Sequence, residues 1–478
     1  MTSHTATVTV ALGIAGLFVL DRDGNAHTSK ALWIPVVWLA VAASRMMGQW
    51  LAAMGVVNGG APIDSADQLL DGSPLDRFLL TMLLALGIVV LLGRRRSVGA
   101  LLRANVPILI FFLYCGASTL WSDYTDVSFK RWVKALGDLA MLLIVLTDRN
   151  PFVAVKRLLT RVGFLLVPVS ILLIKYYPDL GRGWSEWGGG FYKGVASSKN
   201  ELGGVCLLFG LGSAWRVVQA LRGKGSKIWI EFPARAVAIP RSLIAHGALL
   251  AMVIWLFWMA NTVTAISCFL MASVLVMVTN IPALTRKPWR LHFLVTVMLS
   301  VSVCALFLGL GTGLVETMGR DPTLTGRTQI WHLVLSMTTN PLLGTGFESF
   351  WLGPRLQKIW SIYWWRPNEA HNAYIEVFLN LGWIGIALLA VLVTTGYQKV
   401  FNALRRDPDE GGLRLAYFVT ALAYNCTESS IRIMHPVWIF FLLATITVPG
   451  GWERSKKKGW ALASREAGSQ LVPCLEEA

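Results

Sequence analysis

The chain has 478 residues, of which 55% are hydrophobic and 15% are charged, and its mean hydropathy is +0.56. These values exclude an ordinary soluble protein. The formal net charge of +16 does not indicate a nucleic-acid partner, because most lysines and arginines lie in short segments between apolar runs. The composition therefore predicts a polytopic membrane protein.

Apolar runs that are long enough, or nearly long enough, to cross about 30 Å of hydrocarbon recur along the chain. We predict an all-α membrane protein with about 12–14 transmembrane helices. The runs favour one multi-pass domain over residues 1–450, followed by a cytoplasmic tail at 451–478. In chain order, the predicted spans lie near residues 6–20, 31–44, 76–93, 104–121, 132–147, 158–175, 201–221, 242–259, 262–281, 291–312, 373–397, 412–427 and 434–449.

From Arg94 onward, basic residues concentrate in every second connecting segment. The positive-inside rule places these segments in the cytoplasm, and it places the loops 176–200 and 313–371 outside. Before Arg94 the charges balance, so the side of the N-terminus is left open. The first apolar run has no basic region before it, which favours a retained helix over a cleaved signal peptide. The basic segments are 93–103, 148–161, 215–241, 285–290, 398–414 and 453–465.

The two outer loops contain cations where the charge rule disfavours them, among them Arg182, Lys199, Arg320 and Arg327. A planar guanidinium that makes two parallel hydrogen bonds suits a phosphate or pyrophosphate ligand. Contact with lipid headgroups is the structural alternative. In "GRDPTLTGRTQIW" (319–331), small residues such as Thr325 surround both arginines and favour a functional turn.

Further polar residues flank the predicted spans 373–397 and 412–427. His371 and Asn372 precede an apolar helix, and a neutral imidazole there can accept a proton near pH 7, although a lone histidine is more often structural. Glu428 lies near the outer end of the penultimate span, where acidic groups are often functional. An ion pair with Arg432 at helical spacing is the alternative for Glu428. The aromatic segment 351–365 reads as an interfacial anchor, with sugar stacking as the second interpretation.

Three stretches of the later half of the chain, taken in order, resemble the O-antigen ligase and Wzy-type polymerase family of bacterial envelope enzymes. They are "GRDPTLTGRTQIW", "NPLLGTGFESFW" (340–351) and "HNAYIEVFLNLGWIG" (371–385). The long form of the first stretch is similar to the exopolysaccharide polymerase branch. The family-like region spans about residues 201–397, and the large extracytoplasmic loop 313–371 precedes a late helix.

The resemblance implies a GT-C-like membrane glycosyltransferase that uses an undecaprenyl pyrophosphate-linked glycan donor, with neither a cofactor nor a metal. It implies that Arg327 and Arg320 stabilise the leaving pyrophosphate. It also implies that His371 accepts the proton of an attacking hydroxyl or orients that hydroxyl. Arg182 matches an arginine of the earlier loop. In "SSKN", Ser198 stands where a histidine is expected before Lys199 and Asn200, so a role that needs imidazole is absent there. We predict His371, Arg327 and Arg320 as catalytic, and as substrate-binding Arg182, Lys199, Asn200, Asn372, Thr325 and Glu428.

The favoured function is polymerisation of lipid-linked repeat units into exopolysaccharide or O-antigen-type glycan at the periplasmic face of the bacterial inner membrane. The alternative is a ligase that transfers finished glycan to lipid A-core or a protein, and a transporter or flippase is the remote one. Expected partners are the lipid-linked donor, a glycan or lipid-linked acceptor, membrane lipids and other polysaccharide assembly proteins. The sequence does not give the repeat-unit sugars, the linkage, chain-length control or the oligomeric state.

Overall fold

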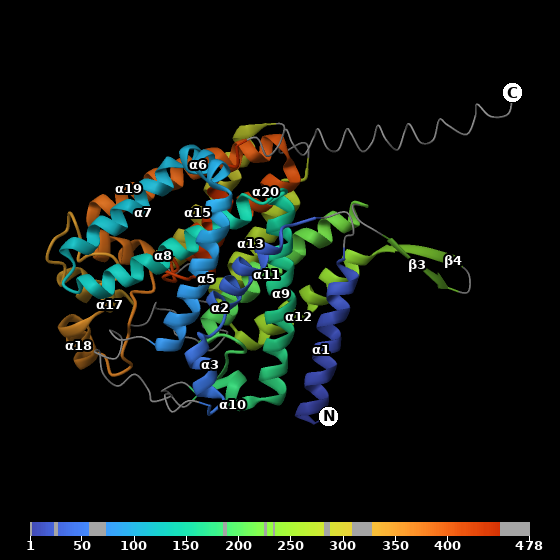
Figure 1. Ribbon diagram of the computed structural model, residues 1–478, viewed down its shortest axis with the longest axis horizontal. Helices are drawn as coiled ribbons and strands as arrows, with labels where there is room; N and C mark the ends of the chain where they lie inside the picture. The colour runs from blue at the N-terminus through green and yellow to red at the C-terminus, as the bar shows by residue number, and fades with distance from the viewer. Residues whose placement is uncertain are drawn as a thin grey trace.

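The structure, a computed structural model, describes residues 2–22, 27–56, 73–184, 189–223, 227–232, 235–281, 287–307 and 327–449. Within these ranges the chain is almost entirely helical (Figure 1). Arg320 and Thr325 lie outside the described residues, as does the predicted tail 451–478. The predicted all-α class is confirmed.

Each predicted span contains a helix. These helices are α1 Ser3–Leu20, α2 Trp33–Ala42, α5 Pro74–Gly93, α7 Val106–Ser118, α8 Thr125–Leu146, α9 Pro151–Tyr176, α11 Lys199–Leu221, α12 Arg241–Ala260, α13 Val263–Val278, α15 Pro288–Phe307, α19 Ala373–Arg406, α20 Pro408–Tyr424 and α21 Pro436–Thr445. Shorter helices connect them: η1 Lys30–Leu32, α3 Met47–Ala53, α6 Arg95–Ala104, η2 Thr119–Trp121, α10 Pro178–Gly181, α17 Arg327–Ser336 and α18 Gly353–Ile362. Two antiparallel hairpins complete the described elements, β1 Arg182–Trp184 with β2 Gly190–Tyr192, and β3 Lys227–Phe232 with β4 Arg235–Pro240.

Six of the described helices are long and apolar enough to cross a membrane, and the number rises to eight if each of two bent helix pairs is one span. Other predicted spans correspond to shorter helices, such as α13 and α21. The chain is therefore a multi-pass membrane protein, while the total of about 12–14 crossings stays a prediction.

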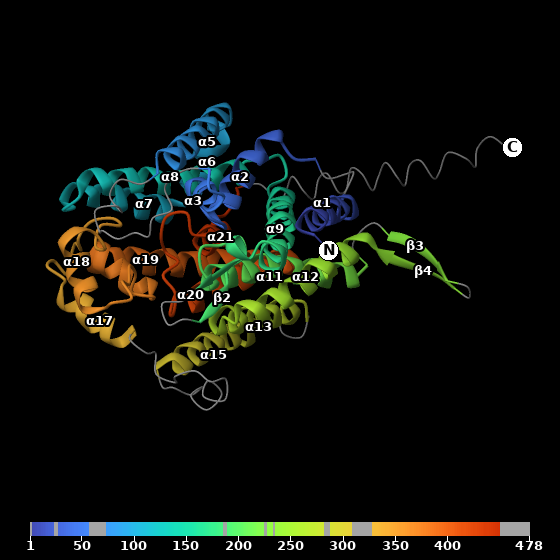
Figure 2. The ribbon, with the colours of Figure 1, turned by 90° about the horizontal axis from the view of Figure 1, so that it is seen from below.

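The helices form layers that place the late spans in the middle. Figure 2 shows α19, α20 and α21 between α5, α7 and α8 on one side and α13 and α15 on the other. The α20 helix contacts α13, α19 and α21, and α7 contacts α19. The outer ends of the late spans are therefore surrounded by protein on both sides.

The two ends of the molecule agree with the predicted loop charges. In Figure 1, the basic helix α6 and the start of α20 lie at one end, and α10 lies at the other. The packing of α1 shows at which end of the molecule the N-terminus lies. The Thr7 hydroxyl lies 2.9 Å from the Tyr177 hydroxyl at the end of α9, so α1 begins at the α10 end. That this end faces away from the cytoplasm stays a prediction from the loop charges.

A buried carboxylate joins the early helices to the connection between α20 and α21. Asp138 on α8 is 1% exposed and accepts hydrogen bonds from Trp38 Nε1 and from the backbone N–H of Met434, each at 2.8 Å. A buried carboxylate without such partners would be costly. These two bonds fix the connection 425–435, which carries Glu428.

A break in α19 positions its first turns. Gly382 has φ +63°, a conformation that favours glycine, and it interrupts the helix. The predicted loop "NPLLGTGFESFW" packs against this break, where Thr345 and Gly346 donate backbone hydrogen bonds to the carbonyls of Leu379 and Asn380. The loop approaches Gly382 closely, because a Cβ on that residue would lie 2.2 Å from the Leu342 carbonyl oxygen.

We predict that Gly382→Ala destabilises the protein by about 2 kcal/mol or more, because alanine is strained at this φ and its Cβ overlaps the facing backbone. Thermal unfolding in detergent measures the effect. Gly99→Ala in α6 is the control, because no atom lies within 4 Å of the added Cβ. Equal melting temperatures for the two variants would contradict the structural role of Gly382.

Candidate functional site

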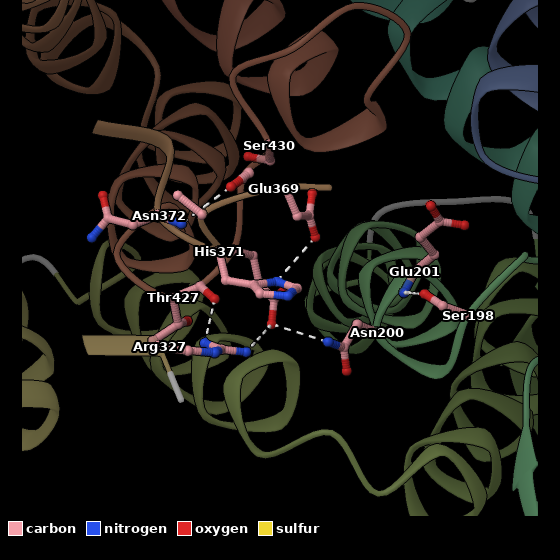
Figure 3. A network of polar contacts seen from close by, with 12 residues as sticks. Ser198, Asn200, Glu201, Arg327, Glu369, His371, Asn372, Thr427 and Ser430 are labelled. Atoms are coloured by element: carbon pink, nitrogen blue, oxygen red, sulfur yellow. Dashed lines mark hydrogen bonds and ion pairs between the residues drawn. The ribbon is translucent and has the colours of Figure 1, made fainter. Parts of the chain in front are cut away.

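The segment just before α19 is bound to the connection between α20 and α21 (Figure 3). Asn372 is the N-cap of α19, and its Oδ1 accepts hydrogen bonds from the backbone N–H groups of Tyr374 and Ile375. Its Nδ2 donates to the Cys426 carbonyl, and its backbone N–H donates to Ser429 Oγ. These contacts account for the helix start and fix the residue before it.

That residue, His371, adopts a backbone φ of +51°, which is uncommon for residues other than glycine. Its Nδ1 lies 3.0 Å from Glu369 Oε1 and 3.8 Å from Glu428 Oε2. Residues held in this backbone region cost stability and concentrate at functional sites. The backbone conformation therefore places the imidazole between two carboxylates.

Arg327, from another predicted motif, reaches one of these carboxylates, that of Glu428. It is the first residue of α17, and its Nη1 donates a 2.6 Å hydrogen bond to the Thr427 carbonyl. Its Nη2 lies 3.5 Å from Glu428 Oε1. The structure thus brings Arg327, His371 and Glu428 together, although they are far apart in the sequence.

The α11 helix supplies the third group of predicted residues. Asn200 Nδ2 donates to Glu428 Oε1 at 3.3 Å. Ser198, which stands where a histidine was expected, is the N-cap of α11 and accepts a hydrogen bond from the Glu201 backbone N–H. A cavity of about 200 Å³ lies here, and its described lining includes Lys199, Asn200, Arg327 and Glu428. Two cations therefore line this cavity beside one carboxylate.

Glu369 was missed in the sequence, and Arg432 was considered there only as a helical partner of Glu428. Arg432 Nη1 donates a 2.6 Å hydrogen bond to Glu369 Oε2, and its Nη2 lies 3.7 Å from Glu201 Oε1. The alternative of a helical Glu428–Arg432 ion pair is wrong, because α20 ends at Tyr424 and the following connection is not helical. The position of Glu369 two residues before His371 was the available signal, since a carboxylate often orients a histidine.

Arg182 is not placed with this group. It lies on the β1–β2 hairpin, where its Nε donates to the Ile174 carbonyl at 3.0 Å and its guanidinium lies over the Tyr192 ring. Its predicted contact with substrate stays a prediction, as do the roles of Arg320 and Thr325.

The charges of the site determine its protonation. Burial alone would lower the pKa of His371, but the carboxylates of Glu369 and Glu428 raise it to about 9. Burial alone would raise the pKa of Glu369, but Arg432 and His371 lower it to about 2. At neutral pH the site therefore contains a charged imidazolium beside an ionised carboxylate.

The same groups could by their chemical type hold a cation. One ligand atom from each of Glu369, His371 and Glu428 lies within 4.8 Å of the others. However, Arg432 and Arg327 already contact the two carboxylates, and a protonated imidazole does not ligate a metal. The arrangement is thus an ion-pair network, and the expected absence of a metal stays a prediction.

Comparison with known proteins identifies the relationship. Residues 241–390 match the O-antigen ligase family model. This stretch of the chain is similar to that family. The matched region contains Arg327, His371 and Asn372, whereas Lys199, Asn200 and Glu428 lie outside it. The resemblance expected from the sequence motifs is confirmed.

A curated relative supports the exopolysaccharide branch. The chain is 24% identical over 356 residues to the exopolysaccharide production protein ExoQ of Rhizobium meliloti (strain 1021). The aligned region covers 72% of this chain and 77% of that protein. Together, the two similarities support a role as a polysaccharide polymerase or ligase, that is, a membrane glycan-transferring enzyme.

We predict that the stability of the protein falls between about pH 6.5 and pH 9 and that His371→Gln removes this fall. The folded-state pKa of His371 is raised, so its contribution is complete below the unfolded pKa of 6.5 and is lost as the pH rises through about 9. A shift of this size corresponds to about 3 kcal/mol at most. Melting temperatures in detergent across this pH range measure it.

The matched control is His332→Gln, which changes an exposed histidine of α17. This variant should keep the wild-type pH dependence. If His371→Gln also kept it, the imidazolium between the two carboxylates would be ruled out.

Proposed function

We propose that the protein polymerises undecaprenyl pyrophosphate-linked oligosaccharide units at the extracytoplasmic face of the bacterial inner membrane. The observation that carries this proposal is the convergence of Arg327, His371 and Lys199 around Glu428. Glycosyl transfer from a pyrophosphate carrier needs cations at the leaving group and a polar group at the attacking hydroxyl. This site offers both within one network.

In the proposal, the donor pyrophosphate binds in the cavity lined by Lys199 and Arg327. Arg327 now contacts Glu428 at 3.5 Å, a long distance for a strong ion pair, so a phosphate with several oxygens can compete for the guanidinium. Asn200 Nδ2 is a further donor beside the same carboxylate. These cations supply the charge that a metal ion supplies in other phosphate sites, and we propose a metal-independent reaction.

His371 orients the acceptor in this proposal. Of the two roles that the resemblance implies, the charged state favours orientation, because an imidazolium donates hydrogen bonds and cannot accept a proton. The hydroxyl proton then passes to a carboxylate of the pair Glu369 and Glu428. The anomeric carbon gains a bond to the acceptor oxygen, and the carrier leaves as the pyrophosphate.

A ligase is the second candidate, because the matching family model is described as O-antigen ligase. It would use the same donor site and the same network, and it would differ in the acceptor. The similarity to a protein named for exopolysaccharide production favours the polymerase.

The experiment that tests the proposal measures the size distribution of carrier-linked glycan in cells lacking the protein and in cells restored with it. We expect single repeat units on the carrier and no long chains in the deletion strain. Long chains that accumulate without release would instead identify a ligase. An unchanged pool would refute both and favour transport.

We predict that Arg327→Lys reduces glycan transfer by roughly 10- to 100-fold, because lysine keeps the charge but loses the two-pronged donor geometry. An assay with purified protein and lipid-linked donor measures the rate. Arg355→Lys is the control, since Arg355 pairs with Asp123 in another part of the outer region and lysine can keep that pair. Near-normal transfer by Arg327→Lys would contradict the pyrophosphate role.

A further inference from the structure

A second, larger cavity lies between α5 and α8, on the other side of the α19–α21 layer from the donor cavity (Figure 2). Its volume is about 580 Å³, within the range of ligand-binding cavities. It is lined by the first turns of both helices, near the ends that the charge rule places outside. None of its described lining residues lines the donor cavity.

The charge of this cavity is strongly positive. Among its described lining residues, five are cationic and one, Glu348, is acidic. Topology does not explain this charge, because cations at extracytoplasmic helix ends run against the positive-inside rule. The cations are Arg77, Lys130, Arg131, Lys134 and Arg432.

Apolar side chains form part of the remaining walls. Leu80 and Leu84 on α5 face the cavity with Phe129 on α8, and Phe129 is 50% exposed. Beyond them, α5 presents exposed Leu86 and Val89 toward the surface of the molecule. A lipid with a polyanionic head and a long apolar tail fits a cationic chamber that opens beside such a helix.

The inner end of the cavity reaches the proposed reaction site. Arg432 lines the cavity and contacts Glu369 at 2.6 Å, and Glu369 contacts His371 at 3.0 Å. A smaller cavity of about 80 Å³ is lined by Glu369 as well as by Glu348 and Arg432. One carboxylate therefore separates the end of the large cavity from the imidazole.

We propose that this cavity binds a second polyprenyl pyrophosphate-linked glycan, the acceptor, so that two carrier lipids occupy the protein from opposite sides of the α19–α21 layer. The inference rests on the proposed function and deepens it, because a polymerase joins two carrier-linked substrates, whereas a ligase needs one. The acceptor sugar extends past Arg432 toward Glu369 and His371. Its pyrophosphate lies among Arg77, Lys130 and Lys134.

Binding stoichiometry tests this inference. Native mass spectrometry of the purified full-length protein, titrated with undecaprenyl pyrophosphate, should show two molecules per chain. The variant Lys130→Gln with Lys134→Gln should weaken one of the two binding events by roughly tenfold or more. Arg327→Gln should weaken the other. A single bound molecule in the wild type would overturn the inference.

Two controls separate charge from structural damage. Lys130→Arg with Lys134→Arg keeps the charge and should restore the second binding event. Lys358→Gln removes an exposed cation of α18 that lines neither cavity and should leave both events unchanged. Weaker binding in the arginine pair would show that the lysines act through folding and would count against the inference.

Phosphatidylglycerol added in excess distinguishes the source of the bound phosphate. If the cavity is selective for the carrier, two molecules of undecaprenyl pyrophosphate still bind. If phosphatidylglycerol removes one of them, the cavity is a phospholipid headgroup site and the inference fails.

A kinetic readout separates failure of this inference from failure of the proposed function. In the transfer assay, the glutamine pair should raise the KM for a single-unit acceptor by roughly tenfold and leave the KM for a long-chain donor unchanged. Polymer formation with one bound carrier would refute the second site alone. If the deletion strain kept an unchanged pool of carrier-linked glycan, or accumulated long chains on the carrier, the proposed polymerase function would be refuted whatever the stoichiometry.

Discussion

The candidate site depends on two carboxylates, Glu369 and Glu428, that lie on either side of His371 close to the apolar region. Glu428 is 8% exposed and contacts side chains from α11, from α17 and from the segment before α19. A buried carboxylate is tolerated only when cations and hydrogen-bond donors compensate the loss of water. Each carboxylate therefore requires its partners in place, and those partners come from segments far apart in the sequence. Electrostatic compensation explains why these segments meet.

The surrounding fold supplies rigid positions for this network. The break at Gly382 lets the loop 340–350 donate hydrogen bonds to carbonyls that α19 leaves unpaired. Asp138 fixes the connection 425–435 from the opposite side through the Met434 backbone N–H. The left-handed backbone of His371 costs energy, and the Asn372 cap on one side and the ion pair with Glu369 on the other offset that cost. The strain is thus maintained by contacts that also define the site.

Much of this architecture could be predicted from the sequence, because hydropathy and charge act locally. The apolar runs marked the helices of the predicted spans, although not the short connecting helices, and the ordered motifs identified Arg327 and His371. The partners of Glu428 could not be predicted, since the helical spacing to Arg432 suggested a local pair, and only the end of α20 at Tyr424 rules it out. The ion pair between Glu369 and Arg432 could not be predicted either, because it joins two non-helical segments that are far apart in the sequence. The large cavity also has no sequence signature, because its lining combines early helices with late loops.

The network has a consequence for how an anionic substrate enters. Two arginines near the reaction site already contact a carboxylate, Arg327 with Glu428 and Arg432 with Glu369. In the proposed reaction, a pyrophosphate that takes over the Arg327 guanidinium leaves Glu428 without this partner. Glu428 can then accept a hydrogen bond from the attacking hydroxyl, at the point where that hydroxyl must lose its proton. In the proposed reaction the same carboxylate therefore has two tasks, because Glu428 pairs with Arg327 before the donor binds and accepts the hydroxyl proton once the donor has taken the arginine.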